Sequence, residues 1–235
     1  MKIGFFGKLP GYGDFVQRNV APDIINQWDN WILQCIETSQ MQLSETWKEV
    51  YFNSPIWRFT IDGRLLSSAA ISHPTSIQHP ISGVMMPSVD SAGRCYPFMI
   101  FCQAQRPVNL FTFANNIDSL HEKCEDFILS LLEQKRPNLD EIAKILQQMY
   151  AKFEENECTD VGMTNVKSST ELCRMSAPQL PAFFHSNHSF FSQLLSRQNM
   201  QLSLWTSAPS MHFDAQKRYY DRLPPVDIFS SFLIG

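Results

Sequence analysis

The sequence has no long apolar run and no excess of charge of one sign. Its 235 residues carry 19 lysines and arginines against 23 aspartates and glutamates, and the basic residues are scattered singly. A nucleic-acid-binding protein needs a basic stripe that neutralises several phosphates, so we expect no nucleic-acid partner. No apolar stretch approaches the ~20 residues of a membrane span, and the N-terminal run is too short for a signal peptide. We therefore expect a cytoplasmic protein that does not insert into membranes.

The sequence also lacks the spacing patterns of disulfide frameworks and metal sites. Its six cysteines form no Cys-x-x-Cys pair and lie mostly in apolar runs, so we expect reduced thiols that pack as small hydrophobic side chains. Cys158 is the cysteine with the most polar surroundings. His185 and His188 have a ligand-like spacing, but no cysteine or carboxylate frame completes a tetrahedral site around them. We predict neither a metal nor a cofactor.

Glycine is sparse, with nine residues, yet three glycines fall in one short segment. Residues 7–18 read Gly-Lys-Leu-Pro-Gly-Tyr-Gly-Asp-Phe-Val-Gln-Arg and follow a short apolar run. A dinucleotide fingerprint starting at Gly11 would need a small residue at Val16, and a Walker loop ending at Lys8 would need serine or threonine at Leu9. The segment therefore predicts a shaped turn, with its glycines at positive φ, in preference to a nucleotide site.

Charged residues embedded in apolar sequence mark a second segment. Residues 86–98 read Met-Pro-Ser-Val-Asp-Ser-Ala-Gly-Arg-Cys-Tyr-Pro-Phe, and together with Asp14 and Arg58 they place two acids and two bases beside large apolar side chains. Acids and bases that cannot reach water must pair. Our hypothesis is that Asp14 or Asp90 contacts Arg94 or Arg58 and that such pairs hold the motif segments together.

Two further interpretations of these residues stay open. Ser88 and Cys95 could be nucleophiles, although no Gly-x-Ser-x-Gly elbow surrounds Ser88. A small hydrolase or nucleotide-dependent enzyme using Asp14, Ser88, Asp90 and Arg94 is therefore the alternative to a binding protein. Interfaces are enriched in aromatic residues and arginine, so an exposed patch would mark a docking surface if it were built from Tyr12, Phe15, Arg18 or Trp57.

Hydrophobic periodicity predicts a single α+β domain over residues 1–235, with a mixed, mostly antiparallel sheet flanked by helices. Apolar residues at helical spacing predict helices over 24–36, 117–132 and 142–153, the last capped by Asn138 and Glu141. Strands are expected over 2–7, 56–61, 81–86, 96–103 and 202–205, and Asp62-Gly63 predicts a hairpin whose second strand is 65–71. We also expect a strand near 172, a helix over 189–196 and an amphipathic segment over 228–233. The polar residues 154–170 form the one plausible internal boundary.

The two motif segments, with Trp28-Asp29-Asn30-Trp31 and Ser54-Pro55-Ile56-Trp57-Arg58-Phe59 between them, resemble the TagF (ImpM) family of bacterial type VI secretion accessory proteins. The resemblance is strongest over residues 1–101 and weaker over 201–235. It departs from the family at Cys95-Tyr96, where relatives usually carry two aromatic residues.

The resemblance implies a non-enzymatic, cytoplasmic protein that represses assembly or firing of the secretion system after translation. It implies protein partners within that apparatus, such as a forkhead-associated scaffold and the membrane-associated core. The residues it marks for partner binding or for holding the motif segments together are Gly11, Tyr12, Gly13, Asp14, Phe15, Arg18, Trp57, Arg58, Ser88, Asp90, Gly93 and Arg94.

Overall fold

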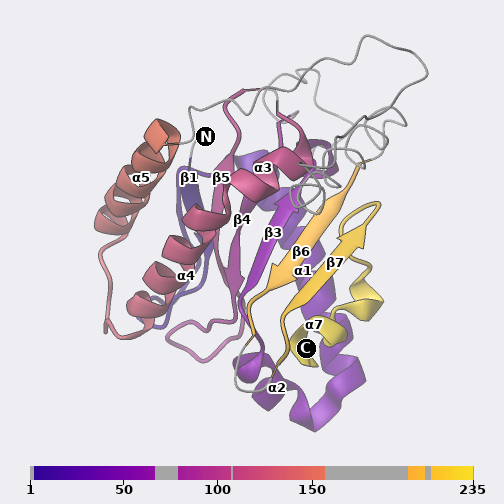
Figure 1. The fold of residues 1–235 in the computed structure, drawn as a ribbon. Coiled ribbons are helices and arrows are strands. Elements are labelled where there is room, and N and C mark those ends of the chain that lie inside the picture. The colour runs from indigo at the N-terminus through magenta and orange to yellow at the C-terminus, as the bar shows by residue number, and fades with distance from the viewer. Residues whose placement is uncertain (1–2, 67–78, 107, 157–200, 210–212, 235) are drawn as a thin grey trace, which may run out of the picture.

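The computed structural model describes residues 3–66, 79–106, 108–156, 201–209 and 213–234, and these form an α+β fold around one sheet (Figure 1). The sheet has seven strands in the order β2-β1-β5-β4-β3-β6-β7, and neighbouring strands in this order are all antiparallel. The strands are β1 (Ile3–Gly7), β2 (Val16–Arg18), β3 (Trp57–Ile61), β4 (Ile81–Met86), β5 (Phe98–Gln103), β6 (Ser203–Ser207) and β7 (Gln216–Tyr220). The predicted fold class is confirmed.

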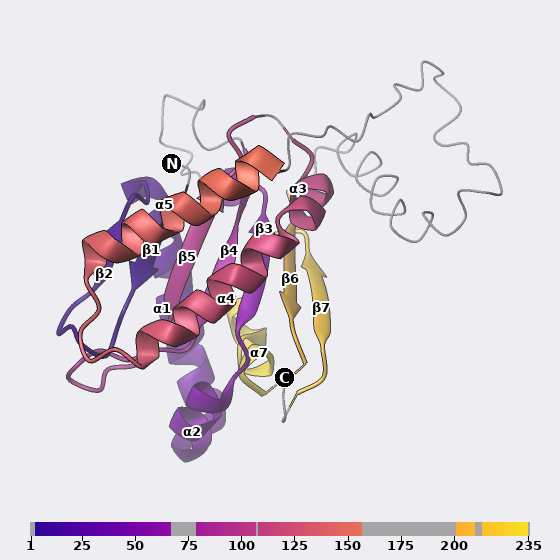
Figure 2. The ribbon, with the colours of Figure 1, turned by 60° about the vertical axis from the view of Figure 1, so that its left-hand side comes forward.

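Helices cover both faces of the sheet (Figure 2). One face carries α1 (Pro22–Leu43), α2 (Trp47–Asn53) and α7 (Ser230–Ile234), with the short 3-10 turns η1 (Ser44–Thr46) and η4 (Val226–Ile228). The other face carries α3 (Leu110–Asn116), α4 (Asp118–Leu132) and α5 (Leu139–Asn156). No helix in the described part of the chain is both long and apolar enough to cross a bilayer.

The alternation of side chains along each strand builds two cores. On β5, Met99 and Phe101 pack toward α1, while Phe98, Ile100 and Cys102 pack toward α4 and α5. Both central strands β4 and β5 are buried at every position, because helices cover both of their faces. The free cysteines Cys35, Cys102 and Cys124 are buried in these cores, as expected; Cys158 lies outside the described residues.

The helices begin and end where local chemistry allows. Pro22 opens α1, where a first-turn N–H needs no partner, and the helix buries the predicted stripe that includes Trp28 and Trp31. Asn138 caps α5, because its side chain accepts hydrogen bonds from the backbone N–H groups of Asp140 (2.9 Å) and Glu141 (3.3 Å). The three predicted helices are confirmed, and α1 continues seven residues past the predicted end at residue 36.

The predicted hairpin at Asp62-Gly63 is wrong. Asp62 Oδ1 accepts the backbone N–H of Arg64 (3.0 Å), Asp62 also binds the Arg64 guanidinium, and residues Gly63–Leu66 form the 3-10 turn η2. This local pairing favours a turn that buries Leu66 in the α1-side core. The partners of β3 are instead β4 and β6. Residues 67–71, the predicted strand near 172 and the predicted helix over 189–196 lie outside the described residues.

Candidate functional site

Sheet topology brings the two motif segments together. We call residues 8–15 the glycine loop and residues 87–97 the hairpin loop. The glycine loop follows β1, and the hairpin loop joins β4 to β5. Since β1 pairs with β5 in antiparallel register, with Gly7 opposite Phe98, both loops leave the same end of the sheet.

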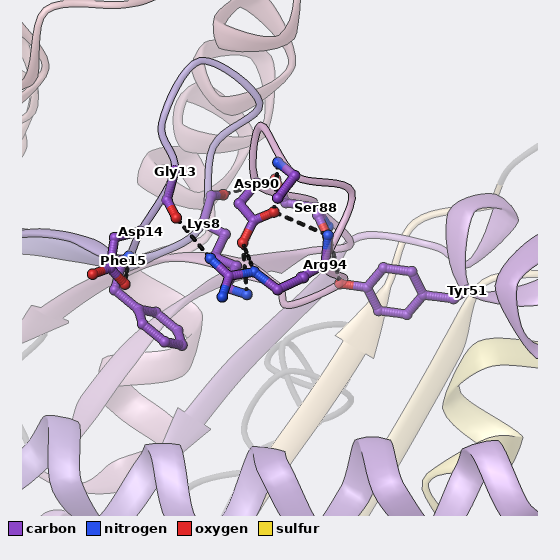
Figure 3. A network of polar contacts seen from close by, with 9 residues as sticks. Lys8, Gly13, Asp14, Phe15, Tyr51, Ser88, Asp90 and Arg94 are labelled. Atoms are coloured by element: carbon purple, nitrogen blue, oxygen red, sulfur yellow. Dashed lines mark hydrogen bonds and ion pairs between the residues drawn. The ribbon is translucent and has the colours of Figure 1, made fainter.

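Asp90 is the centre of a charged cluster between these loops (Figure 3). Its Oδ2 lies 3.0 Å from Lys8 Nζ and 2.7 Å from Arg94 Nε. Its Oδ1 accepts hydrogen bonds from the backbone N–H groups of Ala92 and Arg94, both at 2.9 Å. The predicted contact between Asp90 and Arg94 is confirmed, and Lys8 is a second cation that the sequence reasoning did not pick out.

The surroundings keep the Asp90 carboxylate charged although its side chain is fully buried. Burial alone would raise the pKa of Asp90. The Arg94 backbone N–H, the Lys8 ammonium, the Arg94 guanidinium and the Ala92 backbone N–H outweigh it and hold the pKa below its usual range. Asp90 is therefore a buried charge that fixes the conformation of the hairpin loop.

Direct hydrogen bonds join the glycine loop to the hairpin loop. Arg94 Nη2 donates to the Gly13 carbonyl (2.7 Å), and the Ser91 backbone N–H donates to the Tyr12 carbonyl (2.8 Å). Ser88 Oγ donates to the Lys8 carbonyl (2.7 Å). The predicted pair Asp90–Arg94 forms within the hairpin loop, and the ion pair that joins the two loops is Lys8–Asp90, which was not predicted.

The glycines act in different ways. Gly7 has φ +139° and lies against Pro97, so a Cβ there would stand 2.2 Å from the Pro97 carbonyl oxygen. Gly93, in the hairpin loop, also has positive φ. Gly11 and Gly13 do not, which corrects the prediction made for them. Gly11 is needed for close approach, because a Cβ would lie 2.5 Å from the Lys135 carbonyl oxygen in the turn between α4 and α5.

Phe15 is the exposed aromatic side chain of the site. Its ring is stacked on Phe6 (5.4 Å between centroids) and meets Tyr96 edge-on (4.7 Å), with Lys8 Nζ 5.1 Å from its centroid. The residue is still 41% exposed. Three aromatic or cationic neighbours thus hold a ring that solvent can reach.

Three other candidates for the exposed patch have different places. Tyr12 is half-buried, and its hydroxyl donates to the Pro137 carbonyl (2.6 Å). Arg18 lies on β2, outside the glycine loop, and its Nε pairs with Asp140 on α5 (2.9 Å). Trp57, a candidate for such a patch, does not belong to one, because it is 2% exposed and its Nε1 donates to the Phe232 carbonyl (2.9 Å). It packs in the α1-side core because its face of β3 is covered.

Two of the predicted ion-pairing residues lie apart from the cluster. Asp14 accepts the Phe15 backbone N–H at Oδ1 (2.8 Å) and makes no ion pair within the described residues. Arg58 points to the α4 side of β3, where it binds both Glu125 oxygens and Asp118, each at 2.7 Å. Asp14 and Arg58 therefore do not join the two loops.

Ser88, the serine of the alternative enzyme interpretation, is occupied in structural contacts. Ser88 is 3% exposed, and its backbone N–H and carbonyl both bind the Tyr51 hydroxyl at 3.0 Å. Burial raises the pKa of the Cys95 thiol, against a smaller lowering by Lys48 and Lys8. A thiol with a raised pKa is a poor nucleophile.

A pocket of about 650 Å³ lies on the α4 side of the sheet, between β3, β6, β7 and the ends of α3 and α4. Its lining includes Arg58, Asp118, His121, Thr206 and Lys217, and none of the motif-loop residues. No group of three or more histidine, cysteine, aspartate or glutamate side chains within the described ranges is arranged to hold a metal ion.

A buried polar chain beside this pocket was missed by the sequence reasoning. His121 Nε2 lies 2.9 Å from Ser82 Oγ, which donates to the Phe59 carbonyl (2.7 Å) and also contacts Thr60 Oγ1 (2.7 Å). Burial, with a contribution from the Arg58 charge, lowers the pKa of His121 to about 3. The sequence signal that could have revealed this chain is the position of His121, which falls on the buried stripe of α4.

Comparisons with known proteins found a matching family model and a similar solved structure. The family model of the TagF N-terminal domain, described as type VI secretion system-associated, matches residues 4–149, a range that contains both motif loops. The crystal structure of PA0076 from Pseudomonas aeruginosa PAO1 is similar with a TM-score of 0.68 and 25% sequence identity, over 99% of this chain and 94% of that chain. No curated protein matches.

Proposed function

Because this chain belongs to the TagF family of type VI secretion system-associated proteins, we propose that it is a non-enzymatic regulator that represses assembly or firing of that system after translation. It acts in the cytoplasm by binding a protein component of the apparatus. The forkhead-associated scaffold is the first partner to test, and the membrane-associated core is the second.

One observation carries the proposal: the two motif loops form a single rigid face. The buried Asp90 cluster and the cross-loop hydrogen bonds from Ser91 and Arg94 fix the loops to each other. A face that is already ordered loses little conformational entropy on binding, which favours affinity. The motif serine and carboxylate already make internal contacts, which supports binding over catalysis.

Repression requires only a difference in affinity. A regulator that binds the inactive state of its partner more tightly than the assembly-competent state shifts the population toward the inactive state. Each tenfold preference contributes about 1.4 kcal/mol to that shift. No covalent change of the partner is needed.

The test is complementation of a strain that lacks the protein. Deletion should raise secretion, and the wild-type chain should restore repression. A chain with Phe15→Ala and Arg94→Ala should accumulate normally yet fail to repress and fail to retain the scaffold in a pull-down. The matched control is Arg222→Ala, because Arg222 is also exposed and paired with a carboxylate, in the segment after β7.

Two results would overturn the proposal. Secretion that falls on deletion would indicate an assembly chaperone. Repression that survives in the double variant would remove this face from the mechanism.

A further inference from the structure

We call the surface formed by the glycine loop and the hairpin loop the docking face, and the charge of its Asp90 cluster has the opposite sign to that of the whole chain. The Asp90 carboxylate lies between Lys8 and Arg94, so the cluster of two cations and one anion has net charge +1, against −4 for the chain. Lys8 is 9% exposed at its side chain, whereas Arg94 is 61% exposed. The uncompensated positive charge therefore reaches solvent at Arg94.

Two hydrogen bonds hold the Arg94 guanidinium in place and leave one of its nitrogens able to donate to a partner. Its Nε binds Asp90 and its Nη2 binds the Gly13 carbonyl, while Nη1 has no hydrogen-bond partner within the residues that the structure describes. A guanidinium that is held in place and has a free N–H edge can donate to a carboxylate with little further ordering.

Phe15 provides an apolar anchor beside this cation. In Figure 3 the Phe15 ring lies on the same side of the loops as Arg94, and the Asp14 carboxylate lies on the side of Phe15 away from Arg94. Rigid, partly exposed aromatic residues next to arginine are typical of interface hot spots. Within the described residues Asp14, the exposed acid of the glycine loop, makes no ion pair with Arg94.

We infer that this face binds a segment of the partner protein that places a carboxylate on Arg94 and an apolar side chain on Phe15. The inference rests on the proposed function. A second copy of the chain is the other possible occupant, and a crosslink to it is one outcome of the test below. An anionic membrane would need a cluster of exposed basic residues, and this face presents a single exposed arginine in its loops.

Site-specific photo-crosslinking tests the inference in cells that carry the secretion system. The benzophenone amino acid p-benzoylphenylalanine replaces Phe15, and the crosslinked peptide is identified by mass spectrometry. We expect a segment of a secretion component in which an apolar residue lies within a few positions of an aspartate or glutamate. Arg94→Glu should reduce the crosslink at least tenfold, Arg94→Lys should retain part of it, and Arg222→Glu should leave it unchanged.

A charge exchange gives the sharper test. Reversing the acidic residue of the mapped segment to arginine should restore binding to the Arg94→Glu chain. A mapped segment without an acidic residue, a crosslink to a second copy, or a failed exchange with well-folded proteins would overturn the inference. These outcomes leave the proposed function standing, as would unchanged partner binding in both Phe15→Ala and Arg94→Glu, which removes only this face. Secretion that does not rise on deletion of the protein would remove the proposed function as well.

Discussion

Asp90 and His121 are two buried titratable side chains that avoid an unpaired internal charge in opposite ways. Asp90 stays charged, because two cations and two backbone N–H groups surround it. His121 stays neutral, because burial and Arg58 lower its pKa to about 3. The first arrangement builds the docking face, and the second makes folding depend on pH.

The pH dependence has a definite sign at His121. The unfolded chain takes up a proton near pH 6.5 that the folded chain does not bind until about pH 3, so the free energy of unfolding falls as pH drops below 6.5. One such proton gives a slope of up to about 1.4 kcal/mol per pH unit. Urea unfolding at pH 7.5, 6.5, 5.8 and 5.0 measures it.

His121→Gln is the matched variant, since its amide can donate to Ser82 Oγ but does not titrate. It should lose most of the slope between about pH 6.5 and 5, above the range where most carboxylates titrate. An unchanged slope in this variant would show that other groups produce it.

Residue pairing was only partly predictable from the sequence. Asp90 and Arg94 are four positions apart and share one loop, so their contact followed from proximity. Arg58 has partners more than 50 positions away on α4, and their acidic side chains look like ordinary solvated helix positions in the sequence. Lys8 was not predicted as a buried partner, because lysine is rarely buried without a paired charge.

At the level of elements, the glycine loop depends on the turn between α4 and α5. Gly11 packs against Lys135 and Arg136, the Tyr12 hydroxyl bonds to Pro137, and the Arg136 guanidinium lies 5.0 Å from the Tyr12 ring. The glycine loop is therefore held in place by the turn that joins these two helices.

Gly11→Ala tests this support. Its Cβ would meet backbone atoms at 2.5 and 2.8 Å, so the loop or the turn must move, and we expect a loss of about 1–3 kcal/mol in the free energy of unfolding together with weaker partner binding. Gly13→Ala is the control, because its Cβ would meet only Ser91 Oγ, at 3.4 Å. Equal stability losses in the two variants, measured by urea unfolding, would contradict the packing argument.

Element identity was predictable where periodicity was long. The stripes of α1, α4 and α5 each span several turns, and these three predicted helices are present. The hairpin at Asp62-Gly63 was wrong because a dipeptide signal does not reveal that Asp62 binds Arg64. The pairing of β3 with β6 joins residues more than 140 positions apart, which no local pattern encodes.

For the whole molecule, that long-range pairing makes the C-terminal segment part of the core. The matched family model ends at residue 149, yet β6, β7 and α7 complete the sheet and cover Trp57 and Phe59. Trp31 Nε1 also donates to the Pro224 carbonyl (2.8 Å).

A chain truncated after residue 156 should therefore fail to fold cooperatively. It would leave one edge of β3 unpaired and expose aromatic side chains that Trp205 and Phe232 now cover, and such edges favour aggregation. Calorimetry and binding of a hydrophobic dye, compared with the full chain, measure the effect. A soluble truncated chain with a sharp melting transition would show that the C-terminal segment is dispensable.

The tryptophans share one side of the sheet. All five, Trp28, Trp31, Trp47, Trp57 and Trp205, belong to the α1-side core and none to the core beneath α4 and α5. Tryptophan fluorescence therefore reports on the core between the sheet and α1 and not on the core beneath α4 and α5. It will record loosening of the layer that includes the C-terminus, while the layer supporting the glycine loop can open without a spectral signature.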